Sequence, residues 1–88
     1  MCHMKSFEYV ITDPNGIHAR PAGALVNFAK KYDDDIKISK DGKTADAKRL
    51  LSVMSLGIKY DDKIKVDICG ETEQRTMDDL WNFFGSNL

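Results

Sequence analysis

The sequence predicts an α+β fold, an open-faced β-sandwich in which a four-stranded antiparallel sheet carries three helices on one face. Two kinds of periodicity lead to this class. Strand-like segments alternate apolar and polar residues, so each strand has one face for the core and one for water. Other segments repeat apolar residues at helical spacing, so each helix has a face that must be covered. We expect the order β-α-β-β-α-β-α, with the helices on the dry face of the sheet.

The strands are predicted from alternation and from one hairpin. Apolar residues alternate with polar ones over residues 7–12, around residues 36–38 and over residues 64–68. The Asp41-Gly42 pair is typical of a tight hairpin turn, so residues 43–46 return as a short strand. Each of these strands therefore needs cover on one side only.

The helices are predicted from apolar stripes and from their end signals. Helical spacing indicates helices over residues 19–31 and 47–56, the second stopped by Gly57. Thr72 is a suitable N-cap for a third helix. Four residues of this third helix form an apolar face that we expect in the core: Met77, Leu80, Trp81 and Phe84.

Length and composition favour one small domain that acts through its surface. We assign all 88 residues to a single domain, residues 1–88, with residues 1–4 as a flexible extension. The net charge of -1 gives no broad positive field for nucleic acid, and no segment is long and apolar enough to span a bilayer. We therefore expect no nucleic-acid partner, no membrane insertion and a monomer.

Neither the cysteines nor the acidic residues form a typical metal site. Cys2 and Cys69 lack metal or redox spacing, which favours a reducing compartment and a cytoplasmic protein. We expect Cys69 to be a small, buried or half-buried apolar residue. Asp33, Asp34 and Asp35 are consecutive, so their side chains diverge, and we interpret them as a solvated loop. No metal and no cofactor is expected.

His18 lies where a turn gives way to a helix. Residues 13–16 are strong turn formers, and Pro21 suits the first turn of a helix because its missing N–H removes no helical hydrogen bond. The backbone N–H groups of Ala19 and Arg20 are then free to bind an anion. Arg20 adds a guanidinium that binds phosphate through two hydrogen bonds. The positive helix end also favours the neutral imidazole, the form that attacks phosphorus.

The His18 motif is short, and taken alone it also fits an ordinary helix start beside a solvated arginine. The wider sequence resembles the active-site signature of the histidine-containing phosphocarrier family of the sugar phosphotransferase system. This resemblance rests on Asn15-Gly16-Ile17-His18-Ala19-Arg20-Pro21-Ala22, Asp41-Gly42-Lys43 and Val53-Met54-Ser55-Leu56-Gly57. The order of elements also agrees along essentially the whole chain.

The resemblance implies a phosphoryl carrier that acts as a covalent intermediate rather than a stand-alone enzyme. In this family a histidine receives phosphate on Nδ1 from enzyme I, as a pros-phosphohistidine, and passes it to the enzyme II (IIA) components of sugar transport. By resemblance His18 is the acceptor and Arg20 assists it. The backbone N–H groups of Ala19 and Arg20 are the phosphate cradle.

The second predicted helix carries more apolar residues than one face can bury. Leu50, Leu51 and Met54 lie on one side of it, and Val53 and Leu56 lie on another. We expect the first stripe to be an exposed partner-binding patch, because the family that this chain resembles docks its partners through this helix. Burial of both sides under neighbouring loops is the alternative.

Arg49 departs from the family pattern. In many Gram-positive phosphocarriers a kinase modifies a serine at this position, and an arginine cannot accept phosphate. We therefore predict no regulatory serine, and we interpret Ser52 and Ser55 as structural or solvated residues.

Other functions remain open at this stage. A regulatory paralogue, or a carrier in the related nitrogen branch, would keep the same fold and act mainly through protein binding. A nucleic-acid-binding module on the open sheet is disfavoured by the balanced charge and by strands without paired aromatic residues.

Overall fold

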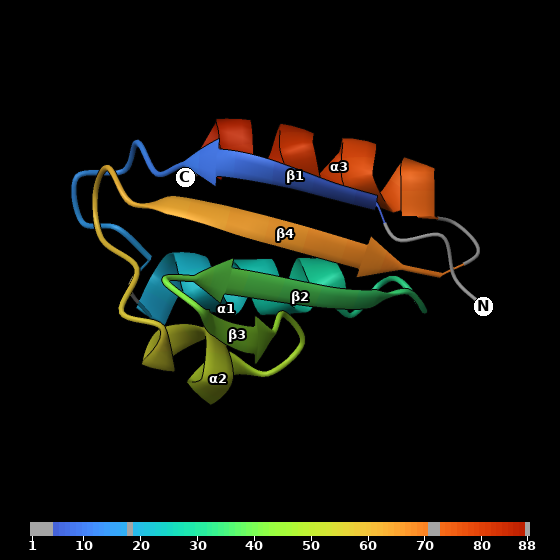
Figure 1. The fold of residues 1–88 in the computed structure, drawn as a ribbon, viewed down its shortest axis with the longest axis horizontal. Coiled ribbons are helices and arrows are strands. Elements are labelled where there is room, and N and C mark those ends of the chain that lie inside the picture. Colours follow the sequence, from blue (N-terminus) through green and yellow to red (C-terminus); the bar gives the residue numbers. More distant parts are fainter. Residues whose placement is uncertain (1–4, 18, 71–72, 88) are drawn as a thin grey trace.

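The structure is a computed structural model that describes residues 5–17, 19–70 and 73–87. It is an open sheet with helices on one side (Figure 1). The elements in chain order are β1 (Lys5–Val10), α1 (Ala19–Ala29), β2 (Asp35–Lys40), β3 (Lys43–Asp46), α2 (Leu50–Ser55), β4 (Lys63–Cys69) and α3 (Glu73–Asn87).

The four strands form one antiparallel sheet in the order β1-β4-β2-β3. Val66 in β4 lies opposite Phe7 of β1 on one side and Ile38 of β2 on the other. Ile38 in turn lies opposite Ala45 of β3. These register positions place apolar side chains in one row across the sheet, so the predicted alternation and the predicted fold class are confirmed.

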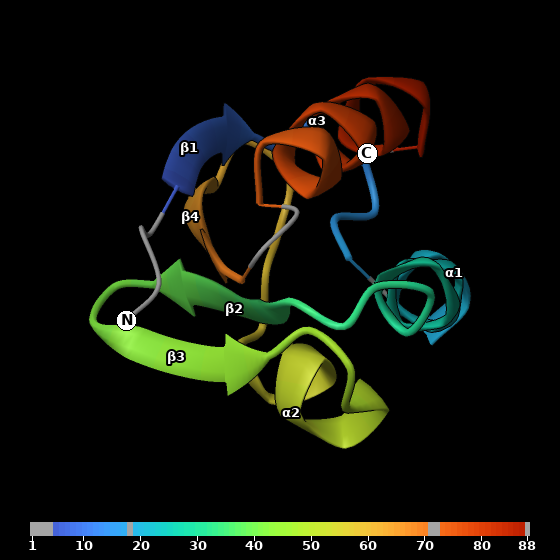
Figure 2. The same ribbon diagram turned by 90° about the vertical axis from the view of Figure 1, so that its right-hand side faces the viewer.

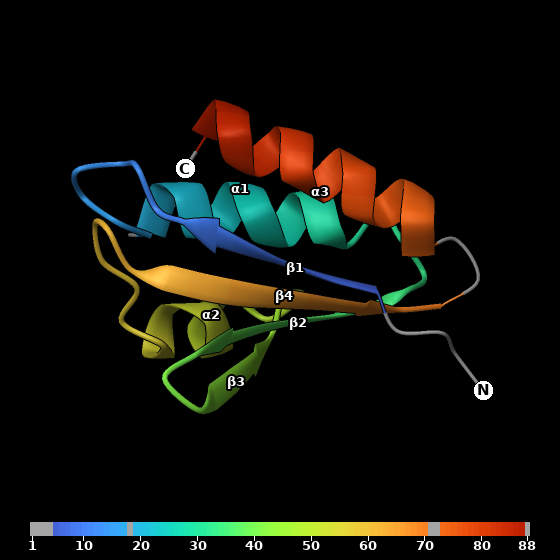
Figure 3. The same ribbon diagram turned by 45° about the horizontal axis from the view of Figure 1, so that its top comes forward.

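The helices cover the dry face of the sheet and leave the other face open (Figures 2 and 3). Packing between the two layers buries side chains from β2, β4, α1 and α3 almost completely. The largest fully buried residues are Phe84, Leu25, Ile36, Ile38, Ile64, Ile68 and Leu80 from these elements, and Ile11 from the loop after β1. No helix in residues 5–17, 19–70 or 73–87 is long and apolar enough to cross a membrane.

The first two helices are shorter than predicted. α1 ends at Ala29 rather than at residue 31, because Lys31 and Tyr32 donate their N–H groups three residues back, which tightens the chain into a turn. α2 begins at Leu50 rather than at residue 47. There, a carboxylate oxygen of Asp46 accepts the backbone N–H of Lys48 and holds a turn ahead of the helix. The predicted cap Thr72 lies outside the described residues.

Trp81 was predicted to lie in the core, but the structure leaves it 49% exposed. Its ring meets the rings of Phe7 and Tyr9 edge-on, with centroid distances of 5.4 and 5.7 Å. Both partners belong to β1, one of the two edge strands of the sheet. Because no further strand lies beyond β1, the outer side of Trp81 faces water.

Asp34 is also a correction, since it is only 3% exposed and does not lie in a solvated loop. Asp33 and Asp35 are exposed as expected. Asp34 lies in the bend directly before β2, where the alternation of buried and exposed residues that continues through Asp35 and Ile36 begins. A Cβ at Gly70 would lie 2.7 Å from the Asp34 carboxyl group, so a glycine there makes room for the buried acid.

Cys69, at the end of β4, is half-buried as predicted but is joined in a disulfide bond. The second sulfur of this bond lies outside the described residues. Disulfides persist mainly in oxidising surroundings. The disulfide bond therefore disagrees with the reducing compartment that we expected from the cysteine spacing.

The end of α1 is connected to α3 through aromatic side chains. The Tyr32 hydroxyl donates a hydrogen bond of 2.7 Å to a carboxylate oxygen of Asp79. Phe28 stacks on Phe83 with ring centroids 4.7 Å apart. Burial, followed by the hydrogen bond to the Asp79 carboxylate, raises the pKa of Tyr32 to about 12.

Replacing Tyr32 by Phe tests the α1–α3 connection. We expect Tyr32→Phe to lower the free energy of unfolding at pH 7 by about 1–2 kcal/mol, as for a part-buried hydrogen bond to a charged group. Because the folded-state pKa is raised from 10.0 to about 12, this contribution is complete below pH 10 and is lost as the pH rises toward 12. Urea denaturation of both proteins across this pH range measures the difference. Equal stabilities at pH 7 would contradict the assignment.

Candidate functional site

The loop before α1 is folded by its own hydrogen bonds. The backbone N–H of Gly16 donates to the carbonyl of Asp13 at 2.9 Å, and the N–H of Asn15 donates to an Asp13 carboxylate oxygen at 2.8 Å. This is an Asx turn, in which the aspartate side chain takes the place of a backbone acceptor. It reverses the chain after β1 and leads Gly16 and Ile17 toward the start of α1.

Gly16 lies against the backbone of a second loop, the one between α2 and β4. Its φ of +66° is in the left-handed region, and a Cβ there would lie 2.5 Å from the carbonyl oxygen of Ile58. The next residue, Ile17, donates its N–H to that same oxygen at 3.0 Å and is buried. Only glycine permits this close approach, which fixes the residue directly before His18.

A second pair of hydrogen bonds joins the same two loops. The N–H of Ile11 donates to the carbonyl of Asp62 at 3.0 Å, and the N–H of Asp61 donates to the carbonyl of Ile11 at 2.9 Å. The Asp62 carboxylate lies 2.7 Å from the Lys40 ammonium and accepts the N–H of Lys59. These interactions, the Lys40 hydrogen bond first, hold the pKa of Asp62 below its usual value.

α1 begins at Ala19, directly after the predicted acceptor His18, which itself lies outside the described residues. Ala19 and Arg20 are exposed, whereas Pro21 and Ala22 are buried and anchor the first turn. Among the described residues, no acceptor is bonded to the N–H groups of Ala19 and Arg20, and no carboxylate pairs with the Arg20 side chain. The two residues predicted to form the phosphate cradle therefore lie exposed at the start of α1.

The two sides of α2 are divided as the sequence pattern predicts. Val53 and Leu56 are buried at 1% and 6% exposure, and they pack the helix onto the core. The opposite side is exposed, and we call it the α2 patch: Leu50 at 40%, Leu51 at 82% and Met54 at 39%. α2 packs beside α1 and ends on the side of the molecule where α1 begins (Figures 1 and 3).

The sequence-based prediction missed the loop at residues 57–62 as a support of the site. Its signals were weak, namely the glycine at residue 57 and the consecutive acids Asp61 and Asp62. Asp61 adopts a φ of +70°, which an aspartate tolerates better than most residues. The partner of this loop, the backbone of Gly16, is 41 or more residues away in the chain (57 minus 16), so no local pattern reports the contact.

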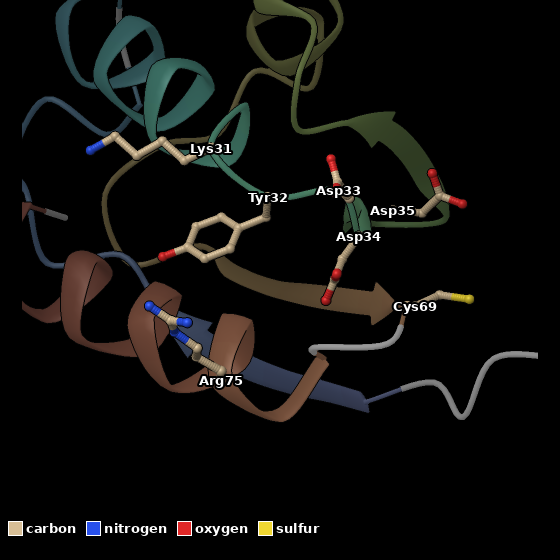
Figure 4. A pocket seen from close by; sticks show the side chains of 8 residues that line it. Lys31, Tyr32, Asp33, Asp34, Asp35, Cys69 and Arg75 are labelled. Atoms are coloured by element: carbon tan, nitrogen blue, oxygen red, sulfur yellow. The ribbon is translucent and has the colours of Figure 1, made fainter.

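A separate pocket of about 600 Å³ lies at the far end of α1 from Ala19 (Figure 4). None of the residues predicted to bind phosphate is among those that line it: Lys31, Tyr32, Asp33, Asp34, Asp35, Cys69, Gly70 and Arg75. In the described part of the chain no three His, Cys, Asp or Glu side chains form a group that could hold a metal ion. The pocket is therefore separate from the helix start.

The fold and the helix start define a small domain whose first helix begins directly after a histidine, with Ala19 and Arg20 exposed in its first turn. Residues 5–86 match the family described as the PTS HPr component phosphorylation site. The chain belongs to this HPr family of phosphotransferase-system proteins. Family and fold support a role as phosphocarrier in that system.

Solved structures of HPr proteins are similar to this chain in sequence and in fold. The phosphocarrier protein HPr of Bacillus anthracis is 32% identical, with a TM-score of 0.86 over 92% of this chain and 96% of that one. HPr of Thermoanaerobacter tengcongensis is 31% identical, with a TM-score of 0.89 over 94% and 93%. Crh, the catabolite repression protein of Bacillus subtilis, is 29% identical, with a TM-score of 0.75 over 86% and 87%. The neighbours thus include both phosphocarriers and a protein named for catabolite repression.

Gly16 and Gly23 form a matched pair for testing the loop contact. Gly16→Ala places a Cβ against the Ile58 carbonyl and strains a positive φ, so we expect a loss of at least about 2 kcal/mol in the free energy of unfolding. Gly23 lies inside α1 with nothing within 4 Å of an added Cβ. Gly23→Ala should therefore raise stability by about 0.5–1 kcal/mol. Chemical denaturation measures both, and similar values for the two variants would rule out the contact as described.

Proposed function

We propose that this protein carries a phosphoryl group on His18, accepting it from phosphorylated enzyme I and passing it to the IIA components of the sugar phosphotransferase system. The observation that carries the proposal is the first turn of α1. It starts directly after His18 and its N–H donors at Ala19 and Arg20 have no acceptor among the described residues. Its Arg20 side chain is exposed and forms no ion pair within that part of the chain.

The chemistry follows from this arrangement. The lone pair of the His18 imidazole Nδ1 attacks the phosphorus atom, the bond from phosphorus to the donor protein breaks, and its electrons stay with the donor. The free N–H groups and the Arg20 guanidinium then compensate the charge on the phosphoryl oxygens. Because these groups are hydrogen-bond donors, and form no covalent bond to phosphorus, the phosphoryl group stays transferable to the next protein.

The α2 patch is proposed as the docking surface for both partners. Leu51 is 82% exposed beside Met54, so the patch has apolar area that the monomer leaves uncovered. Methionine adapts its shape to different partners. An exposed surface next to the start of α1 suits a carrier that must bring His18 into contact with a donor and then with an acceptor.

The remaining parts of the proposal concern assembly, regulation and location. We propose a monomer of one domain over residues 1–88, acting in the cytoplasm, where the phosphotransferase relay operates, and lacking a regulatory serine because Arg49 occupies that position. The disulfide at Cys69 is unusual for that compartment, where thiols are kept reduced.

A second candidate function is regulation through protein binding, as in a paralogue that has kept the fold. It is favoured by the presence of Crh, the catabolite repression protein of Bacillus subtilis, among the structural neighbours. A carrier of the nitrogen branch would use the same site chemistry.

Phosphorylation by enzyme I tests the carrier function directly. We expect incubation with enzyme I and phosphoenolpyruvate to add one phosphoryl group that is labile in acid and stable in base, as a phosphohistidine is. His18→Ala should abolish the label while circular dichroism stays unchanged. Mass spectrometry and acid treatment measure the outcome. An unlabelled wild-type protein, or label that persists in the variant, would reject the carrier function and leave the regulatory one.

Leu51→Glu tests the α2 patch. We expect the KM for phosphorylation by enzyme I to rise at least about tenfold, the effect of losing one central interface residue, with an unchanged melting temperature because Leu51 is 82% exposed. Val10→Glu is the matched control, since Val10 is 45% exposed on β1 and its side chain lies on the open face of the sheet. Steady-state kinetics measure both, and an equal change in the two variants would contradict the assignment.

A further inference from the structure

Lys40, the last residue of β2, has a side chain that is mostly buried. The strand period of two places it on the same side of β2 as the core residues Ile36 and Ile38, and only 16% of its side chain is exposed. By contrast, the side chains of Lys63 and Lys65, which also lie near carboxylates, are 62% and 55% exposed. Ordering a lysine costs side-chain entropy and part of its hydration. The contacts that Lys40 makes must offset this cost.

The Lys40 ammonium binds both ends of the loop at residues 57–62. It donates a hydrogen bond of 2.8 Å to the carbonyl oxygen of Gly57, the residue after the C-cap of α2. It also lies 2.7 Å from a carboxylate oxygen of Asp62, which directly precedes β4. The same Asp62 oxygen accepts the backbone N–H of Lys59 at 2.7 Å. One ammonium therefore constrains residues 57, 59 and 62 together.

The loop that Lys40 binds is the one against which the segment before α1 packs. Ile58, which follows Gly57, accepts the N–H of Ile17 on its carbonyl oxygen, and the backbone of Gly16 approaches that same oxygen. Figures 1 and 3 show the end of β2, this loop and the start of α1 on one side of the molecule. Lys40 and Ile17 therefore bind the carbonyl oxygens of two successive residues.

We propose that Lys40 is a positioning residue for phosphoryl transfer, whose ammonium holds the loop at residues 57–62 so that the Ile58 carbonyl fixes Ile17, the residue to which His18 is attached. This inference rests on the proposed function and deepens it. Transfer requires the attacking atom to be aligned with phosphorus, and a displacement of about 1 Å can cost about a hundredfold in rate. Lys40 acts on that rate through the backbone, without contacting the phosphoryl group.

Replacing Lys40 by Met tests this role, because Met keeps the length of the side chain and removes the ammonium. We expect Lys40→Met to lower the rate of transfer from phosphorylated enzyme I at saturation at least about fivefold, as for a displaced reacting group. The enzyme I concentration at half-saturation should stay within about twofold of wild type, because the α2 patch is unchanged. Lys40→Arg keeps the charge and the hydrogen-bond donors and should recover most of the rate. Single-turnover rapid-quench kinetics measure both quantities.

Two control variants separate positioning from a general loss of charge or of stability. Lys65→Met removes an ammonium from the open face of the same sheet, and Tyr32→Phe weakens the α1–α3 connection. Both should transfer within about twofold of the wild-type rate, because neither residue contacts the loop at residues 57–62. Asp62→Asn removes the other member of the ion pair and should slow transfer as Lys40→Met does. The double variant should lose less than the product of the two single effects, since both act on one contact.

Amide hydrogen exchange reports the loop contact without any phosphoryl transfer. We expect the N–H of Ile17 to exchange at least about tenfold faster in Lys40→Met than in wild type, while the N–H of Val66 in β4 keeps its rate, as for a local opening. A wild-type transfer rate or wild-type Ile17 exchange in Lys40→Met, or an equal slowing of transfer in Tyr32→Phe, would overturn this proposal alone. A wild-type protein that enzyme I does not phosphorylate would overturn the proposed function and this proposal together.

Discussion

The close approach of Gly16 to the backbone at Ile58 is the contact on which the site depends. Two loops that are distant in sequence meet there without a side chain between them, and Ile17 adds a hydrogen bond to the same carbonyl. These contacts fix the backbone conformation of the loop at Gly16 and Ile17. Since the first turn of α1 follows directly, the position of Ala19 and Arg20 is set by these backbone contacts together with the Asx turn of Asp13.

Much of the fold follows from periodicity, because burial on one face imposes a period of two on strands and a stripe on helices. The alternation around Val66 and the apolar stripe with Leu80 and Phe84 predicted β4 and α3 for this reason. Periodicity could not predict which strands lie at the edges of the sheet. Trp81 continues the stripe of α3, yet it lies against the edge strand, and no pattern within α3 reports that the sheet ends at β1.

The site was predictable where it is local and unpredictable where it is not. Pro21 and the turn residues before it indicate where a helix begins, and the structure starts α1 within that turn. The support from residues 57–62 arises from backbone hydrogen bonds, which leave no mark on side-chain pattern. Asp34 shows the same limit, since its burial depends on room left by Gly70 on another strand end.

The brevity of α2 has a consequence for recognition. A helix of six residues does not hold together by itself in water, so its shape is imposed by the buried side chains of Val53 and Leu56. A partner consequently meets a surface that is already ordered, and little of the binding free energy is spent on arranging it. The exposed residues of α2 are thus free to vary with the partner, while the buried pair beneath them keeps the surface in shape.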